Sequence, residues 1–453
     1  MNCTAMRKNR FATFGRALLA LSLFTLTAAQ AANWPNWRGP DYNGSSPAKN
    51  LPTNFSKTES VLWAADLPGP SASTPVIWGD NVFVSSLDNR TRDLLAICLD
   101  RKTGKEIWQQ KVGIGIQQDN RSNQASPSPV TDGKIVVFFY GNGDLIAFDL
   151  DGKKLWQRNI QKDYGQFAFL WTFSTSPVLF ENTLYMQVLQ RDVPVNGRGR
   201  TDGPNDSYLL ALEPMTGKEM WRKVRPCEAV LEAKEAFSTP IPVEFKGQKQ
   251  LLIAGGDYLT GHDPKTGDIL WSWGTWNEAR ITHWRLVPSP VFGDGIALVC
   301  APKKEPAFAV KLGGIGKLPD SAIAWQSERA GAISSDVPTP AFANGDFYVL
   351  GDAPKKVSRV AAKSGEVKWT AQLPGRAKYE SSPTVADGKV YVMNFKAEVV
   401  VLNAENGEIL HTAALGDPTD DMTRSVIAVA GNNLFIRTNT KLYCIGQKQL
   451  AKQ

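Results

Sequence analysis

One pattern recurs along almost the whole chain and limits what it can fold into. Each copy has a small residue followed by Pro and an aliphatic residue, a tight turn, two short β-rich runs, and a Gly turn that leads to a Trp. In residues 126–160 the pattern reads SPSPVTDGKIVVFFYGNGDLIAFDLDGKKLWQRNI and predicts four short antiparallel strands. A four-stranded meander of this size cannot bury both of its faces alone, so the copies must pack on one another.

The spacing of the copies is that of propeller blades. Their Pro anchors are Pro75, Pro129, Pro177, Pro240, Pro290, Pro340 and Pro383, with Ile427 in the last copy, and their closing residues are Trp108, Trp156, Trp221, Trp271, Trp325, Trp369 and His411. The anchors lie about 43 to about 63 residues apart, which suits blades with loops of variable length. Helical periodicity is nearly absent, which excludes a helical solenoid.

The last copy, residues 425–445, lacks a closing Trp strand. A spare strand of that type, SVLWAADL at 60–67, stands before the first complete copy. Pairing the two would close the ring and remove its sheet edges. We therefore predict an all-β fold, an eight-bladed β-propeller of four-stranded antiparallel blades closed by an N-terminal strand around Trp63. Seven blades is the alternative, if one copy is degenerate.

The N-terminal residues do not follow the repeat. A group of basic residues (Arg7, Lys8, Arg10, Arg16) precedes an apolar run at 17–29, and Ala29-Gln30-Ala31 fits the small-x-small cleavage rule. Residues 1–31 therefore predict a secretory signal peptide that is cleaved after Ala31. We expect 32–57 to be an extension that packs on the ring, because its Trp34, Trp37 and Tyr42 are too many aromatics for a solvated linker. Residues 58–447 would form the propeller and 448–453 a tail.

Charge and cysteines bear on the compartment. Removing the four basic residues of the signal peptide lowers the net charge from +7 to about +3, which gives little support for nucleic-acid binding. No Cys follows the cleavage site for a lipid anchor, and the apolar run is too short for a good membrane span. We expect a periplasmic or secreted monomer with no transmembrane segment. Cys98, Cys227, Cys300 and Cys444 show no spacing that selects a disulfide, and we expect buried or unpaired thiols.

The repeats, with turns such as KTGKEIW (102–108) and KTGDILW (265–271), resemble the pyrroloquinoline quinone (PQQ) repeat over essentially the whole mature chain. The resemblance implies that the repeated Trp and Gly residues pack blade on blade. It has two characterised branches. Quinoprotein dehydrogenases hold PQQ and Ca²⁺ over the central axis, whereas the propeller lipoprotein of the outer-membrane β-barrel assembly machinery is a scaffold without a cofactor.

Candidate binding residues come from the connections between blades, which cross one face of a propeller and end beside its axis. They are Arg121, Asn123, Trp171, Glu235, His283, Trp284, Arg285, Asp336, Glu380 and Arg424. Aromatic, cationic and carboxylate groups that converge in a concave mouth are the default hypothesis for a ligand site. The alternative interpretation is that opposite charges at a mouth that faces water simply pair. We name no catalytic residue and no metal ligand, because the chain's three histidines are not clustered.

We expect an exported, non-catalytic propeller that acts as a binding or scaffold module in the periplasm or cell envelope. Its partners would be envelope proteins, or a small-molecule or carbohydrate ligand, held on the loop-rich face without a cofactor. The alternative is a PQQ-dependent quinoprotein oxidoreductase that acts on an alcohol or sugar with PQQ and Ca²⁺. The resemblance implies an adjacent Cys pair and a longer cover over the cofactor for such an enzyme, and this chain has neither.

Overall fold

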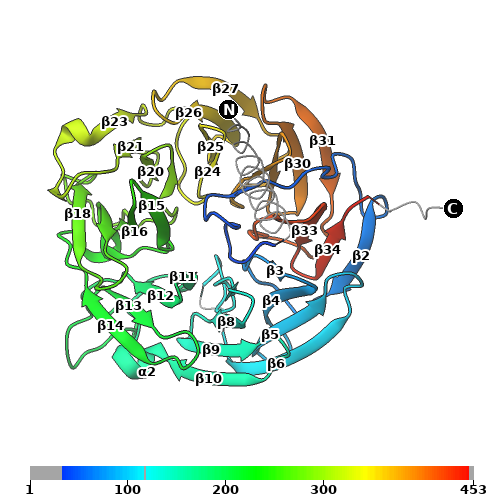
Figure 1. Ribbon diagram of the computed structural model, residues 1–453, viewed down its shortest axis with the longest axis horizontal. Helices are drawn as coiled ribbons and strands as arrows, with labels where there is room; N and C mark the ends of the chain where they lie inside the picture. Colours follow the sequence, from blue (N-terminus) through cyan, green and yellow to red (C-terminus); the bar gives the residue numbers. More distant parts are fainter. Residues whose placement is uncertain (1–32, 117–118, 448–453) are drawn as a thin grey trace, which may run out of the picture.

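Eight antiparallel sheets stand around a central axis in the computed structural model, which describes residues 33–116 and 119–447 (Figure 1). The predicted signal peptide at 1–31 and the tail at 448–453 lie outside the described residues. The eight sheets confirm the predicted eight-bladed propeller against the seven-bladed alternative. The described helical segments are short, namely α2 (Ile160–Tyr164) and the 3-10 turns η1 (Leu231–Lys234) and η2 (Asp320–Ala322).

Each of the first seven blades is a meander of four strands that runs outward from the axis (Figure 1). Blade 1 is β3 (Val76–Trp78), β4 (Asn81–Leu87), β5 (Asp93–Asp100) and β6 (Glu106–Ile114), and blade 2 is β7 (Val130–Thr131), β8 (Ile135–Phe139), β9 (Asp144–Asp149) and β10 (Lys154–Asn159). Blade 3 is β11 (Val178–Phe180), β12 (Thr183–Val188), β13 (Tyr208–Leu212) and β14 (Glu219–Val224), and blade 4 is β15 (Ile241–Phe245), β16 (Gln248–Gly255), β17 (Tyr258–His262) and β18 (Ile269–Gly274). Blade 5 is β19 (Val291–Gly293), β20 (Ile296–Cys300), β21 (Ala307–Lys311) and β23 (Ile323–Gln326), and blade 6 is β24 (Ala341–Ala343), β25 (Asp346–Gly351), β26 (Lys356–Ala361) and β27 (Val367–Gln372). Blade 7 is β28 (Thr384–Ala386), β29 (Lys389–Met393), β30 (Glu398–Asn403) and β31 (Ile409–Ala414).

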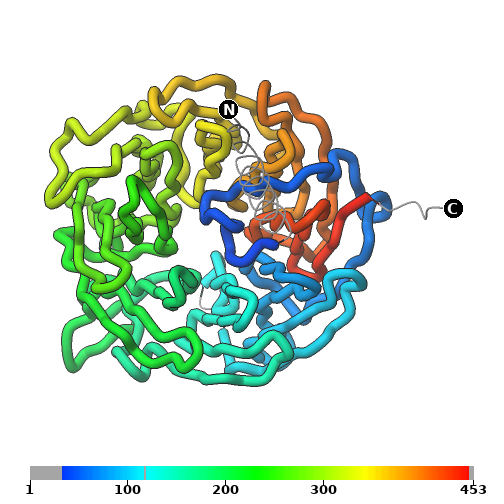
Figure 2. The backbone as a smooth tube through the Cα atoms, in the orientation of Figure 1, coloured from blue at the N-terminus to red at the C-terminus, as the bar shows by residue number. Residues whose placement is uncertain are grey.

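The eighth blade joins the two ends of the chain. Its strands β32 (Ala428–Ala430), β33 (Asn433–Arg437) and β34 (Lys441–Ile445) come from the C-terminal part, and β2 (Val61–Asp66) comes from the N-terminal part. β2 pairs antiparallel with β34, with Trp63 opposite Cys444. The blue and red segments therefore lie side by side in Figure 2. The predicted closing strand is confirmed, and it covers the edges that an open ring would expose.

Contacts between neighbouring blades explain the repeated Trp and Gly. Trp108 of blade 1 donates its indole N–H to the Leu150 carbonyl of blade 2 at 3.0 Å, and a Cβ on Gly152 would lie 2.7 Å from the indole ring. The same contact joins Trp63 to Gly104, Trp156 to Gly217, Trp221 to Gly267, Trp325 to Gly365 and Trp369 to Gly407. These six glycines have φ between 68° and 86°, a backbone conformation that glycine adopts without strain. Each copy of the repeat thus forms the docking surface for the copy before it.

Two blades depart from this rule because the blade that follows them has no such Gly turn. The chain after β21 instead forms β22 (Gly316–Lys317), which pairs parallel with β18, and Trp271 donates to Gln250 of its own blade at 2.7 Å. Blade 8 takes its fourth strand from the N-terminal part, so it has no turn between its third and fourth strands. His411 instead meets Phe55, with Nε2 2.6 Å from the Phe55 carbonyl oxygen.

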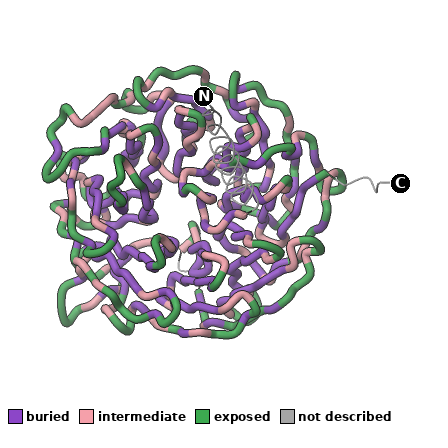
Figure 3. Tube along the Cα trace, in the orientation of Figure 1, coloured by how far each residue is buried: buried purple, intermediate pink, exposed green. Residues whose placement is uncertain are grey.

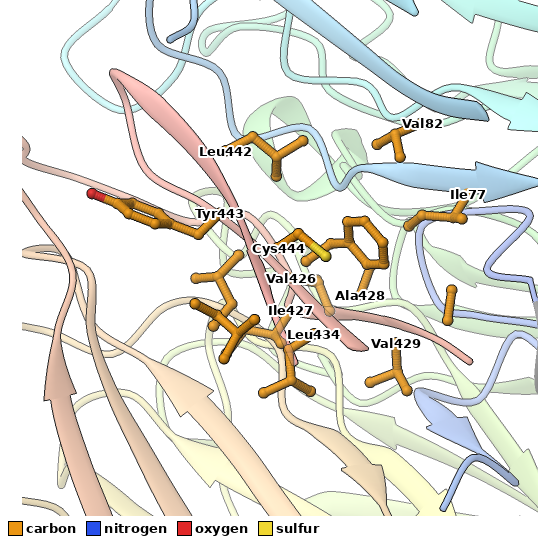
Figure 4. Packing of buried hydrophobic residues seen from close by; sticks show 14 of the residues in the cluster. Ile77, Val82, Val426, Ile427, Ala428, Val429, Leu434, Leu442, Tyr443 and Cys444 are labelled. Atoms are coloured by element: carbon orange, nitrogen blue, oxygen red, sulfur yellow. The ribbon is translucent and has the colours of Figure 1, made fainter. Parts of the chain in front are cut away.

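Buried residues predominate in the strands of the blades, while exposed residues gather at the outer rim of the ring (Figure 3). Figure 4 shows one interface between adjacent blades, where Ile77 and Val82 of blade 1 share a cluster with Leu434 and Cys444 of blade 8. All four cysteines in the described part of the chain are free.

Residues 33–57 form a segment that we call the strap. Trp34 exchanges two backbone hydrogen bonds of 2.9 Å with Ile77 of blade 1, and β1 (Ser45–Ser46) pairs parallel with β28 of blade 7. The fully buried Arg38 donates to the Pro383 carbonyl at 2.9 Å and to the Pro340 carbonyl at 2.6 Å, and burial lowers its pKa to about 9. The strap therefore ties blade 1 to blades 6 and 7 across one face of the ring (Figure 2).

Candidate functional site

A cavity of about 480 Å³ lies on the axis, lined by residues from all eight blades and by Trp37 of the strap. Its volume falls in the range of about 300 to 1,000 Å³ that is typical of small-molecule sites. Trp37 places the strap at one end of the cavity. The other end carries the connections between blades, and we call that side the funnel face.

Seven hydroxyl residues form a collar around the cavity, each standing directly before the Pro anchor of its blade. They are Thr74, Ser128, Ser176, Thr239, Ser289, Thr339 and Ser382. The backbone N–H of each of the first six donates to the hydroxyl of the next blade at 2.8 to 3.2 Å. Val426 takes the eighth position and has no hydroxyl. Every collar hydroxyl except that of Thr74 accepts in these bonds, so its own proton can donate to a group in the cavity.

Seven of the ten predicted site residues line this cavity at its funnel end. They are Arg121, Trp171, His283, Arg285, Asp336, Glu380 and Arg424. They come from connections far apart in the sequence, and propeller closure brings them onto one wall. Ligand binding by these residues stays a prediction.

The other three predicted residues have structural roles. Glu235 is fully buried, where it accepts from Arg191 Nε at 2.5 Å and from the Leu170 N–H at 3.0 Å, and burial, opposed by Arg191, raises its pKa to about 7. Asn123 donates to the Pro70 carbonyl at 2.8 Å and holds a turn. Trp284 packs into the hydrophobic cluster of blades 3 to 5. None of the three lines the cavity.

Several groups on the wall are already paired. Arg424 Nε donates to Glu380 Oε2 at 2.8 Å, and its guanidinium lies 4.6 Å from the Phe395 ring centre. The Arg121 guanidinium lies 5.9 Å from the centre of the Trp171 ring, a cation–π geometry. The Trp171 indole N–H in turn donates to Glu232 at 3.0 Å. These contacts fix the orientation of the aromatic surface.

Arg285 is the exception. Its Nε lies 3.7 Å from Glu232 Oε1 and its Nη2 lies 3.9 Å from Asp336 Oδ2, which are ion-pair distances too long for hydrogen bonds. Its Nη1 is buried and has no hydrogen-bond partner among the described residues. The side chain is only 17% exposed. A largely buried guanidinium without close acceptors can offer its N–H donors to a carboxylate or another acceptor that enters the cavity.

Sequence reasoning missed five charged residues of the wall, namely Asp119, Glu232, Lys303, Asp352 and Lys378. Lys303 and Asp352 lie between the second and third strands of their blades, and these turns open on the same face as the connections between blades. Burial raises the pKa of Asp352, opposed by the Asp336 N–H, which donates to it at 2.9 Å. With these residues, the wall holds five Arg or Lys side chains and five carboxylates, so its charges balance.

This balance bears on PQQ, which would need cations for its three carboxylates. Arg424 is paired with Glu380, and Asp336 lies between Arg285 and Lys303 at 3.9 and 3.5 Å. Arg285, Lys303 and Arg424 thus have a carboxylate within 4.0 Å already, whereas Arg121 and Lys378 form no ion pair among the described residues. Within residues 33–116 and 119–447, no group of three or more His, Cys, Asp or Glu side chains is placed to hold a metal ion. That this wall holds no PQQ stays a prediction.

Comparison with known proteins assigns the family. The family model described as outer membrane protein assembly factor BamB matches residues 54–193 and 317–449, which is more than half of the chain. The chain belongs to this family. The BamB family match and the eight-bladed ring together confirm a PQQ-like propeller.

Individual relatives are distant. BamB of Burkholderia pseudomallei is 23% identical over 186 residues, which cover 40% of this chain and 39% of that protein. A polyvinylalcohol dehydrogenase of a Pseudomonas species is 23% identical over 220 residues, 46% of this chain and 30% of that protein. The chain thus matches less than half the length of these relatives.

Solved structures share the fold at low identity. BamB from Moraxella catarrhalis has a TM-score of 0.58 at 13% identity and covers 87% of this chain and 99% of its own. A europium-containing methanol dehydrogenase has a TM-score of 0.61 at 12% identity and covers 92% of this chain and 89% of its own. At such identity the likeness concerns the fold alone. No described helix is long and apolar enough to cross a membrane.

Proposed function

We propose that this protein is a binding and scaffold module of the cell envelope that holds a protein partner on its funnel face. Membership of the BamB family carries the proposal, because that family is named for the assembly of outer-membrane proteins. The balanced wall supports it as well, since five cations and five carboxylates suit a polar protein surface better than a ligand of one charge.

Arg285 is the residue of the funnel face that we expect to contribute most. A partner carboxylate or backbone carbonyl could reach the N–H groups that Glu232 and Asp336 leave without hydrogen bonds. An arginine anchored in the centre of an interface is typical of a binding hot spot. The same donors could receive a small polar ligand or a sugar hydroxyl, with Trp171 as the stacking surface.

Photocrosslinking in the native host tests the partner. Benzoylphenylalanine at His283, on the funnel face, is compared with benzoylphenylalanine at Glu366, in an outer turn of blade 6. The proposal expects one discrete adduct of an envelope protein from His283 only, weakened about tenfold or more by Arg285→Gln. Adducts of equal yield from both positions, or none from either, would contradict a partner on the funnel face.

Compartment and cofactor need separate tests. Fusing alkaline phosphatase to the C-terminus of the full chain should give an active reporter, because that enzyme needs the disulfides of an oxidising compartment. An inactive but intact fusion would contradict export. Titration with PQQ and Ca²⁺, followed by Trp fluorescence and calorimetry, should show no saturable binding. One-to-one binding that Arg285→Ala weakens would instead support a quinoprotein oxidoreductase.

A further inference from the structure

A second hollow lies on the strap face. We call it the strap groove, and it has a volume of about 410 Å³ between strap residues 40–43 and the inner strands of blades 3 to 6. The turn between the first and second strands of each blade lies on this face, opposite the funnel. Nothing in the proposed role of the funnel face uses this groove.

Aromatic rings form the walls of the strap groove. Phe180 of β11, Phe292 of β19 and Phe342 of β24 line it, and all three remain partly exposed. Tyr42 closes the strap side, held by a 2.8 Å hydrogen bond from its hydroxyl to the Leu179 carbonyl. The Phe342 ring lies against Gly293, where a Cβ would stand 2.3 Å from it. The rings are therefore held in place without being fully covered, so that part of their aromatic surface stays accessible to a ligand in the groove.

The charge of the groove is of one sign. Asp41, Glu244 and Asp294 line it and are exposed, and its lining contains no Lys, Arg or His. Within the described part of the chain, none of the three carboxylates forms an ion pair or a side-chain hydrogen bond. Lys249 stands opposite Glu244 in the β15–β16 ladder, yet it pairs with Glu181 instead. The groove thus differs from the funnel face, where cations and carboxylates balance.

We propose that the strap groove binds Lys or Arg side chains of an extended basic segment of a partner protein. Aromatic faces attract a cation, and the methylene stem of Lys or Arg packs on the same rings. The three carboxylates then meet the charged ends of these side chains. An acidic segment would be repelled, and a purely apolar one would bury carboxylates without a partner. The lining extends over four blades, which suits a segment of several residues.

The test uses the mature protein and a fluorescein-labelled peptide amide, Gly-Lys-Ala-Arg-Gly-Lys-Gly, followed by fluorescence anisotropy. The matched probe has Gln in place of each Lys and Arg. We expect saturable binding of the basic peptide and at least tenfold weaker binding of the Gln peptide. Equal affinity for the two peptides, or no binding of either, would overturn the proposal.

Two double variants show where the peptide binds. Glu244→Gln with Asp294→Asn removes two exposed carboxylates of the groove, and we expect about tenfold weaker binding. Glu366→Gln with Glu408→Gln removes the same charge from exposed outer turns and should change affinity less than about twofold. An equal loss in both variants would show non-specific attraction and overturn the proposal. Phe292→Leu, which keeps an apolar side chain, should weaken binding about threefold by removing the aromatic face.

Discussion

His262 provides a quantitative prediction for the dependence of stability on pH. It is 1% exposed in β17, with Nδ1 3.0 Å from the Gly267 carbonyl oxygen and Nε2 2.9 Å from Thr260 Oγ1. A neutral ring fits both contacts, since Nδ1–H can donate to the carbonyl and Nε2 can accept from the hydroxyl. Arg225 donates Nε to the same hydroxyl at 3.1 Å and opposes a second positive charge. Burial, reinforced by Arg225, lowers the pKa of His262 to about 4.

The sign follows from comparing the folded and unfolded chains. An unfolded His has a pKa of about 6.5, so above that pH both states hold a neutral ring and the contribution of His262 to stability is complete. As the pH falls toward 4, the unfolded chain takes up a proton that the folded protein excludes. Between pH 7 and pH 5 this difference removes about 2 kcal/mol of unfolding free energy.

The measurement is urea unfolding followed by Trp fluorescence at pH 7, 6 and 5, on the wild type and on His262→Gln. The variant should be less stable at pH 7, because it loses the fit of the ring. Its stability should fall less with pH, so that the gap between the two proteins narrows by about 2 kcal/mol at pH 5. Carboxylates titrate in both proteins and cancel in the comparison. A gap that stays constant from pH 7 to pH 5 would refute the reasoning.

Three further substitutions, one of them with a control variant, test the ring itself. Val426→Thr supplies the hydroxyl that the collar lacks next to Ser382. It should raise the unfolding free energy by about 1 kcal/mol in urea melts, whereas a loss of stability would show that the eighth position cannot accept the bond. Gly407→Ala places a Cβ 2.6 Å from the Trp369 indole at a backbone φ of 76°. It should lower the unfolding free energy by about 2 to 4 kcal/mol. The control is Gly388→Ala, at a φ of 69° with nothing within 4 Å of the added Cβ. It should lower the unfolding free energy by only about 1 kcal/mol, and equal losses in the two variants would contradict the docking of Trp on Gly. Trp63→Ala removes the indole that donates to the Arg101 carbonyl at 2.8 Å. It should lower the unfolding free energy by about 3 to 5 kcal/mol and speed proteolysis of β2. Unchanged resistance to protease would show that β2 closes the ring without this indole.

The ring could be predicted from sequence because its repeated residues act locally and in sequence order. A Gly turn and the Trp after it define one blade, and the next copy supplies the surface on which that Trp docks. The two exceptions also have local causes. The segment after β21 forms β22 in place of the Gly turn on which Trp271 would dock, and blade 8 takes β2 as its fourth strand and so has no such turn for His411.

The candidate site could be predicted only in part. Connections between blades end at the axis in any propeller, which is why the sequence could place Arg121, Arg285 and Arg424 beside the cavity. Glu235 was misplaced because its neighbour Ala236 bridges both Leu189 and Leu286, which draws the segment into the core. Such bridges join residues about 50 positions apart and leave no periodic pattern. The strap groove depends on where a segment without repeats crosses the ring, and no periodic pattern in the sequence specifies that path.

The pairing of β2 with β34 also determines when, during synthesis of the chain, the ring can close. The partners are about 380 residues apart, so β2 leaves the ribosome long before the strand with which it pairs. At synthesis rates of about 5 to 20 residues per second, that interval lasts roughly 20 to 80 seconds. During this interval the incomplete ring has an unpaired sheet edge at the end that is still being synthesised. At its N-terminal end, β2 has no strand to pair with. The ring therefore cannot close before β34 has been synthesised, and any protein that binds the chain before that moment meets an open arc of blades.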